Sequence, residues 1–284
     1  MTSASPALEL IDREAGGPVV LSVPHGGRDY RPDQRARLRP PAEKLIVLED
    51  RLVDEVAAEA GAPTLVARAP RAWIDINRHE AEIDPGLVEG TVASRLMLTP
   101  KVRSGLGLIP RRLAGIGEIW RGRISLADVE ARLAEVHRPY HAAIAELLRE
   151  AAGMHGIAVL LDLHSMPPLA RQGGEKTPQV VIGNRFGHSA AAWVTSRIAA
   201  TCTRFALGWR ENSPYAGGHI VERHGAPGSG VHAVQLELDR SLYLEGSGEQ
   251  CDPDGLAFCR QFLRAVIEDL RAAALERAMP LAAE

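Results

Sequence analysis

The sequence predicts an α/β layered fold with a single domain over residues 1–284. Short apolar runs that end in polar or glycine-rich turns alternate with amphipathic segments of helical period along the whole chain. Two of these runs are followed by a histidine, His25 and His164, where the chain leaves a predicted strand. Because chemistry in open α/β sheets gathers at the carboxyl ends of strands, both histidines are candidate site residues.

The central strand is predicted at residues 159–161, a short apolar run between glycines and a pair of prolines. Asp162, His164 and Ser165 crowd at its end. His164 is there either a metal ligand or base, or a strand-end histidine that binds a backbone carbonyl. The strand predicted at 18–23 ends in the sequence PHGG, whose glycines allow a close approach of backbone or ligand.

The next segments carry polar groups suited to a carboxylate or a metal. A helix is predicted from about Glu49 to Ala60, and spacing alone makes Asp50 a cap, because the helix dipole favours carboxylates there. Residues 73–80 alternate between apolar and polar as a half-buried strand does, and deliver Asn77 and Arg78 side by side. An arginine fork beside an amide grips a carboxylate, although a surface salt bridge is the simpler alternative.

Residues 95–123 form a loop-rich, arginine-rich excursion in which Glu118 is the single acid. Long loops of this kind are often lids or binding loops, and an excess of arginine suits an acidic small molecule or a solvated face. A capping box at Ser125 then begins a helix that Pro139 kinks or divides. His137 and His141 have the spacing of helical metal ligands, but no third ligand is obvious, and we do not expect a metal there.

The remaining elements continue the alternation, with strands at 63–69, 179–183, 220–222 and 231–239 and helices at 187–201 and 256–279. A glycine-rich turn from Asn212 to His219 enters the strand at 220–222. In the last strand, Glu237 shares one face with Gln235 and Asp239. A carboxylate on an otherwise buried strand is costly unless it is paired or functional, which makes Glu237 a candidate catalytic group.

Composition disfavours several classes of function. A net charge of −3 and an aromatic content of 4% argue against a nucleic-acid-binding surface. No apolar run approaches the roughly 18 residues that span a bilayer, and the N-terminus lacks the features of a signal peptide. The cysteines, Cys202, Cys251 and Cys259, form no CxxC pair and fit reduced thiols. We expect a cytoplasmic protein without nucleic acid or membrane partners.

If the strand ends converge, His25, His164, Arg78 and Glu237 meet at one site. Two histidines and one carboxylate form a catalytic zinc shell that leaves a position open for water. Zinc lowers the pKa of such a water to near ~7 and polarises a carbonyl, and a further carboxylate can act as general base.

Eight segments match one family in order between about residues 20 and 245: SVPHGGRDY, LEDRLVDEV, PRAWIDINR, IPRRLAGIGEIWRGRIS, HRPYH, DLHSMPP, NSPYAGGHIVERHG and QLELDRSLYL. On these segments the chain resembles the N-formylglutamate amidohydrolase family. The resemblance implies a zinc-carboxypeptidase-like (phosphorylase/hydrolase-like) fold, which is a three-layer α/β/α arrangement with a mixed, mainly parallel central sheet. It also implies hydrolysis of N-formyl-L-glutamate to formate and L-glutamate, a step of histidine catabolism in this family.

The resemblance further implies one Zn²⁺ per chain, held by His25, Asp50 and His164, in place of the cap role of Asp50. Asn77 and Arg78 are expected to bind the substrate α-carboxylate, and Glu237 to carry a proton from the attacking water to the leaving amine. Four further residues match motif positions of the family near the substrate, and no individual role is assigned to them: Tyr215, His219, Arg223 and Arg240. For the second carboxylate of the substrate, our own hypothesis names one or more arginines of the excursion: Arg103, Arg111, Arg112 and Arg121, with Arg111 as the assigned residue.

Other functions stay open. One alternative is the same machinery acting on another N-acyl amino acid or a small peptide, because pocket shape sets the choice of acyl group and side chain. The short HxxE pair of carboxypeptidases is absent, since Arg28 stands three residues after His25, which disfavours a true carboxypeptidase. A non-catalytic metal-binding or ligand-binding protein needs no base such as Glu237. A serine hydrolase built on Ser165 lacks the GxSxG elbow. Manganese, cobalt or iron also fit such a metal shell.

Overall fold

The computed structural model describes residues 7–170, 177–246 and 249–278, which form two compact units. Of the described residues, the first unit contains 7–9, Pro24–Asp50 and Val66–Ala142. The second contains Leu10–Val23, Arg51–Leu65, 143–170, 177–246 and 249–278.

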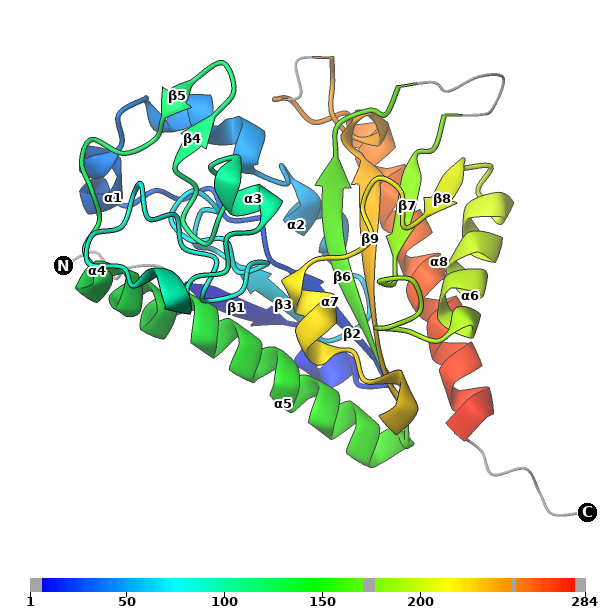
Figure 1. The fold of residues 1–284 in the computed structure, drawn as a ribbon. Helices are drawn as coiled ribbons and strands as arrows, with labels where there is room; N and C mark the ends of the chain where they lie inside the picture. The colour runs from blue at the N-terminus through cyan, green and yellow to red at the C-terminus, as the bar shows by residue number, and fades with distance from the viewer. Residues whose placement is uncertain (1–6, 171–176, 247–248, 279–284) are drawn as a thin grey trace, which may run out of the picture. The chain divides into compact units, whose positions relative to one another are not determined.

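The main sheet has seven strands in the order β1-β3-β2-β6-β9-β7-β8 (Figure 1). Five belong to the second unit: β2 (Val19–Val23), β6 (Ala158–Met166), β9 (Val231–Asp239), β7 (Val180–Gly183) and β8 (Trp209–Glu211). The residues of β1 (Leu8–Ile11) and β3 (Thr64–Ala67) are divided between the units. Pairing is parallel from β2 through β6 to β9 and between β7 and β8, and antiparallel between β9 and β7. The predicted mixed, mainly parallel sheet is confirmed.

Helices of the second unit cover both faces of its strands (Figure 1). One face carries α2 (Val53–Ala57), α6 (Ala192–Arg204) and α8 (Pro253–Ala278), and the other carries α7 (His219–His224). The apolar side of α8 is buried at the helical spacing expected from the sequence, by Phe262, Leu263, Val266, Ile267 and Leu270. The predicted three-layer arrangement is therefore present; the last residue predicted for this helix, Met279, lies outside the described residues.

Strand β6 is the fourth of the seven strands and is buried along its whole length, as predicted for the central strand. It extends further than the apolar run alone indicates. β9 pairs with β6 residue for residue as far as Met166, so the backbone of Asp162 and His164 is held within the sheet. These polar residues therefore project from the strand itself and not from a loop after it.

The first unit is built from short elements and long irregular connections: α1 (Pro32–Arg37), α3 (Pro100–Arg103), β4 (Arg112–Leu113), β5 (Gly117–Glu118) and α4 (Leu126–Arg132), with 3-10 turns at Ala42–Leu48 and Ala93–Arg95. The predicted cap at Ser125 is confirmed, since its hydroxyl accepts the N–H of Asp128 at 3.2 Å. A π-helical turn at Leu133–His137 precedes α5 (Arg138–His155), so the helix is disturbed beside Pro139 as predicted.

The strand predicted at residues 73–80 is wrong, because this segment forms buried turns. Three of its carbonyl oxygens are hydrogen-bonded to side chains, so they need no neighbouring strand. Arg132 binds the carbonyl oxygen of Trp73. His141 binds that of Ile76, and His137 binds that of Arg78. The two histidines that have metal-ligand spacing thus support the backbone of the segment that carries Asn77 and Arg78.

Two other elements also differ from the predictions. The helix predicted from Glu49 begins at Val53, after Leu52 in a left-handed conformation with φ of 56°, so Asp50 is not its cap. The strand predicted at 220–222 is instead part of α7. Its two apolar residues are buried and the next two polar residues are exposed, a pattern that is too short to separate one helical turn from a strand.

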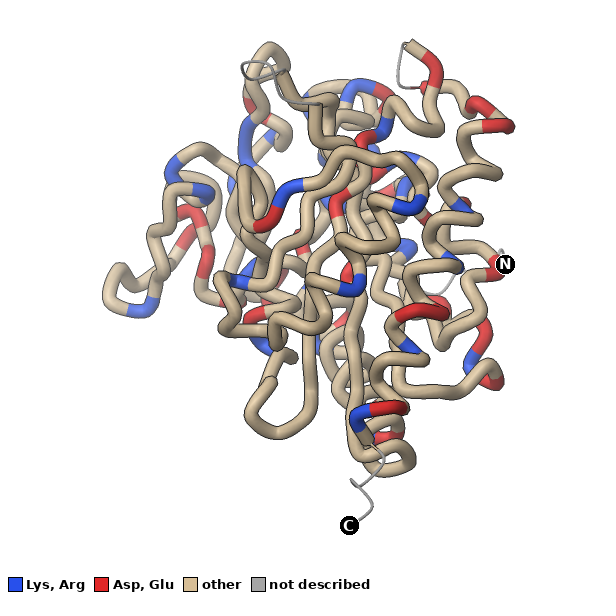
Figure 2. Tube along the Cα trace, turned by 90° about the vertical axis from the view of Figure 1, so that its right-hand side faces the viewer, with Lys and Arg blue, Asp and Glu red and all other residues tan. Residues whose placement is uncertain are grey.

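Acidic and basic residues are interspersed along the traced chain (Figure 2), in keeping with the small net charge. In the part of the chain that the structure describes, each helix is too short or too polar to cross a bilayer.

Candidate active site

In the first unit, His25 and Asp50 lie side by side. The backbone N–H of Asp50 donates to the carbonyl oxygen of His25 at 3.1 Å, and Asp50 Oδ2 lies 3.3 Å from His25 Nδ1. Two ligands at a tetrahedral angle on zinc, each about 2.1 Å from the ion, stand about 3.4 Å apart. The spacing of these two atoms therefore fits neighbouring positions of a metal shell.

The PHGG turn holds His25 close to the chain that follows β3. A Cβ added to Gly27 would lie 2.4 Å from the carbonyl oxygen of Ala69, so the two backbones approach only because this residue is glycine. Tight packing therefore accounts for Gly27.

Asp75 binds the other nitrogen of the His25 ring. Its Oδ1 accepts from His25 Nε2 at 2.8 Å, and its Oδ2 accepts from Arg71 Nε at 2.9 Å. Burial raises the pKa of Asp75, but Arg71, Arg78 and His25 outweigh burial and hold this pKa well below its usual range. Asp75 therefore fixes the orientation of the His25 ring, in the way that carboxylates support histidines which bind metals.

Asn77 and Arg78 are both buried, which excludes the surface salt bridge as an account of Arg78. Arg78 Nη1 donates to the carbonyl oxygen of Asn77 at 2.8 Å, and its Nε donates to that of Leu106 at 3.0 Å. Its Nη2 lies 3.8 Å from Asp75 Oδ2. The guanidinium is thus held by fixed backbone oxygens, in the same cluster that orients His25.

In the second unit, His164 on β6 pairs in register with Glu237 on β9. Side chains at paired positions project from the same face of a sheet. His164 Nε2 lies 2.9 Å from Asp162 Oδ2, and Asp162 Oδ1 accepts from the Ser22 hydroxyl at 2.7 Å. His164 therefore has the same support as His25, a buried carboxylate on Nε2.

The other predicted substrate residues of the second unit lie around α7 and the end of β9. Tyr215 is half-buried in the loop before α7, His219 is buried in the first turn of that helix, and Arg223 is exposed at its last turn. Arg240 follows β9, where its Nη2 lies 3.4 Å from the hydroxyl of Ser165. His224, beside Arg223, has its pKa lowered to about 4 by burial and by Arg223, against an opposing effect of Asp162.

Arg111 lies in the first unit and already has acidic partners. Its Nε donates to Asp84 at 2.7 Å, and its Nη1 lies 3.4 Å from Glu118. Arg103 and Arg121 are exposed, and neither forms a side-chain ion pair with any residue of the described ranges. Arg95 and Arg112 are exposed and likewise form no ion pair among the described residues, so the uncompensated positive charge of the excursion lies at these four arginines.

Each unit thus gathers its own part of the predicted set: His25, Asp50, Asn77 and Arg78 in the first, and His164 and Glu237 in the second. Three residues that support them were not predicted as site residues: Asp75, Asp162 and Gln235. For Asp162 and Gln235 the available signal was their place two residues before His164 and Glu237; Asp75 supports His25, 50 positions away, and the sequence has no signal for it.

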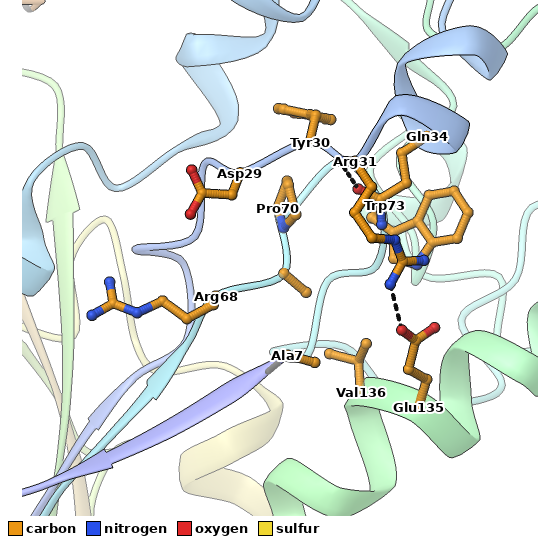
Figure 3. Close-up of a pocket in the computed structure, with 11 residues that line it drawn as sticks. Ala7, Asp29, Tyr30, Arg31, Gln34, Arg68, Pro70, Trp73, Glu135 and Val136 are labelled. Carbon is orange, nitrogen blue, oxygen red and sulfur yellow. Dashed lines mark hydrogen bonds and ion pairs between the residues drawn. The ribbon is translucent and has the colours of Figure 1, made fainter. Parts of the chain in front are cut away.

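A cavity of about 160 Å³ opens elsewhere in the first unit (Figure 3). Tyr30, Arg68 and Trp73 line it, and Arg31 pairs with Glu135 across its wall, where their N–O distance is 2.5 Å. Among the described residues, those that line this cavity include no predicted site residue. We therefore do not place the active site there.

Comparisons with known proteins agree with the motif pattern. The family model described as N-formylglutamate amidohydrolase matches residues 17–244. The chain is similar to N-formylglutamate deformylase of Pseudomonas aeruginosa, with 33% identity over 263 residues, 89% of this chain and 91% of the relative. It is also similar to N-formylglutamate deformylase of Pseudomonas putida, with 28% identity over 233 residues, 80% of this chain and 82% of the relative. The crystal structure of N-formylglutamate amidohydrolase from Ralstonia eutropha JMP134 matches with a TM-score of 0.84 and 28% identity, over 96% of this chain and 98% of that one.

Proposed function

Because the chain belongs to the N-formylglutamate amidohydrolase family, we propose that it hydrolyses the amide bond of N-formyl-L-glutamate to formate and L-glutamate. The observation that carries the proposal is the matched support of two histidines, His25 by Asp75 and His164 by Asp162. Buried carboxylates on the Nε2 atoms of two histidines are typical of metal ligands. The reaction would supply glutamate during histidine catabolism in the cytoplasm.

The proposed metal is one Zn²⁺, with His25, Asp50 and His164 as its ligands. Two imidazoles and one carboxylate are a donor set of catalytic zinc sites, and the 3.3 Å spacing of His25 and Asp50 is compatible with it. When bound, zinc would supply Lewis acidity toward the formyl oxygen and lower the pKa of water to near ~7. In this proposal the two units act together as one amidohydrolase domain.

Glu237 is proposed as the general base. Its carboxylate takes a proton from the water that attacks the formyl carbon, and it gives that proton to the amine nitrogen as the C–N bond breaks. Formate and the free amine of glutamate are then the products. Glu237 suits this role because it is buried on a strand face that it shares with His164.

Binding of the substrate is proposed to use the arginines. Arg78 and Asn77 take the α-carboxylate, since Arg78 presents a planar fork held in place by backbone oxygens. For the side-chain carboxylate we propose Arg111, assisted by Arg103, Arg112 or Arg121, because Arg111 already shares its charge with Asp84. Tyr215, His219, Arg223 and Arg240 are proposed to line the remainder of the substrate site.

The test is formate release from N-formyl-L-glutamate by the chelated and the zinc-restored protein. Glu237→Gln is measured in parallel, with Glu268→Gln, an exposed glutamate of α8, as the matched control. We expect turnover that requires metal, falls by at least about 100-fold in Glu237→Gln and is unchanged in Glu268→Gln. Full activity without metal would contradict the mechanism. One bound metal without formate release would reject the substrate, and other N-acyl amino acids would then be assayed.

A further inference from the structure

We infer that Gln235 is a positioning residue that fixes the carboxylate of Glu237 and ties it to the loop before α7. The inference rests on the proposed role of Glu237 as general base. Gln235 Nε2 donates to Glu237 Oε1 at 2.7 Å, and Gln235 Oε1 accepts the backbone N–H of Gly218 at 2.7 Å. One amide therefore connects the proposed base with the backbone at the first turn of α7.

The chemistry of its two partners fixes which way the Gln235 amide faces. The N–H of Gly218 can only donate, so it must meet the amide oxygen, and the NH₂ group must then face the carboxylate of Glu237. Gln235 is 5% exposed, so water offers little replacement for either bond. A rotated amide would leave buried polar groups unpaired, and this penalty keeps the amide in one orientation.

The register of the sheet places Gln235 in a supporting row. Asp162, Gln235 and Gly183 are paired across β6, β9 and β7, two residues from the row that contains His164 and Glu237. In this supporting row, Asp162 binds His164 and Gln235 binds Glu237, each two positions further along its own strand. Gln235 therefore does for the proposed base what Asp162 does for the proposed metal ligand.

Gly183, the third member of the supporting row, leaves space for the loop of Tyr215 beside Gln235. A Cβ on Gly183 would lie 2.7 Å from the backbone nitrogen of Gly217 and 3.0 Å from the carbonyl oxygen of Tyr215, so the loop occupies the space that a side chain would fill. The N–H of Arg185 also donates to the carbonyl oxygen of Ala216 at 2.7 Å. The loop that carries Tyr215 is thus seated on the supporting row, next to Gln235.

Two substitutions separate the two bonds of the amide. Gln235→Glu keeps an acceptor for the N–H of Gly218 but replaces the donor to Glu237 with a carboxylate. Gln235→Met has nearly the same length and loses both bonds. At pH 8, we expect kcat for formate release to fall about 10-fold or more in both variants. KM should change less than about 2-fold in Gln235→Glu, and it should rise in Gln235→Met because the loop of Tyr215 loses its anchor.

A double-mutant cycle with Glu237→Gln shows whether Gln235 acts through Glu237. If it does, Gln235→Met lowers kcat strongly in the wild-type background and less than about 2-fold in the Glu237→Gln background. An equal fold-loss in both backgrounds would overturn the inference, and so would unchanged kcat in both Gln235 variants. Thr201→Val, which removes a buried hydroxyl bonded to Asp269, controls for general destabilisation and should leave kcat unchanged.

The inference also has a readout that does not depend on turnover. In the NMR spectrum of the protein labelled with ¹⁵N-glutamine, one side-chain amide proton of Gln235 should have a strongly shifted signal. This signal is assigned to Gln235 because it disappears in Gln235→Met. We expect this signal to move in Glu237→Gln and to stay in place in Glu268→Gln. If the signal does not move in Glu237→Gln, the hydrogen bond between Gln235 and Glu237 is contradicted. By contrast, a protein that releases no formate but keeps this signal would contradict the proposed function and not the contact.

Discussion

His164 and Glu237 stand at paired positions of neighbouring parallel strands, and each is hydrogen-bonded to the residue two positions earlier on its own strand. The strand period of two places the supporting and supported residues on the same face. The orientation of these two side chains is thereby set by the sheet itself. His25 differs, since its support comes from Asp75 in a buried turn.

The supporting carboxylates should control metal affinity. Asp75→Asn and Asp162→Asn keep the shape of the side chain and remove its charge, and each should weaken zinc binding about 10- to 100-fold. Competition with a zinc chelator measures this affinity directly. Asp269→Asn, at a carboxylate on α8 that pairs with Arg204, is the matched control and should bind zinc as the wild type does. Unchanged affinity in both supporting variants would contradict the ligand roles of His25 and His164.

The arginines of the excursion should discriminate charge on the substrate side chain. Charge reversal of Arg103, Arg111, Arg112 or Arg121 should raise KM for N-formyl-L-glutamate more than KM for the uncharged N-formyl-L-glutamine, because only the former has a second carboxylate. For Arg111 the expected difference is about 10-fold or more, the scale of one charged hydrogen bond. Equal changes for the two substrates at every arginine would remove the excursion from the specificity site.

A methyl group at Gly183 should displace the loop that carries Tyr215. Gly183→Ala places its Cβ against backbone atoms of Gly217 and Ala216, which cannot rotate away. We expect kcat/KM to fall about 10-fold or more while the zinc affinity stays within about 2-fold. Gly153→Ala is the control, because a Cβ there meets nothing within 4 Å and alanine favours the α5 helix. A Gly183→Ala variant with wild-type kinetics would show that the loop tolerates displacement.

His224 should make stability fall in mild acid. Its pKa is lowered from 6.5 to about 4 in the folded protein, so between these values the unfolded chain binds a proton that the folded chain does not. The free energy of unfolding therefore decreases as pH falls through this window, and the loss is complete below about pH 4. His224→Gln removes this contribution. Denaturant unfolding at several pH values measures the free energy of unfolding of both proteins. Relative to the wild type, this free energy should rise in the variant from pH 7 to pH 4. A difference that stays constant over this range would contradict the prediction.

Much of the second unit could be predicted from the sequence because its strands are marked by apolar runs. The alternation in residues 231–239 placed Glu237 on a shared face with Gln235, and both the bounds of β9 and this shared face are confirmed. The same rule failed at residues 73–80, where alternation arose from buried turns. All residues from Trp73 to Arg78 are buried, so the alternation did not mark an exposed face. Nor can a sequence pattern tell whether a carbonyl oxygen binds a strand or the side chain of Arg132.

The sequence by itself determined the family, the mixed α/β architecture and the identity of the candidate site residues, because these depend on local patterns and on motifs kept in order. Only the tertiary structure decided what holds those residues in place. Asp75 meets His25 across 50 positions of the chain, and Ser22 meets Asp162 across 140. Such contacts are set by how distant segments pack against one another, and hydrogen bonds between packed segments leave no periodic trace in the sequence.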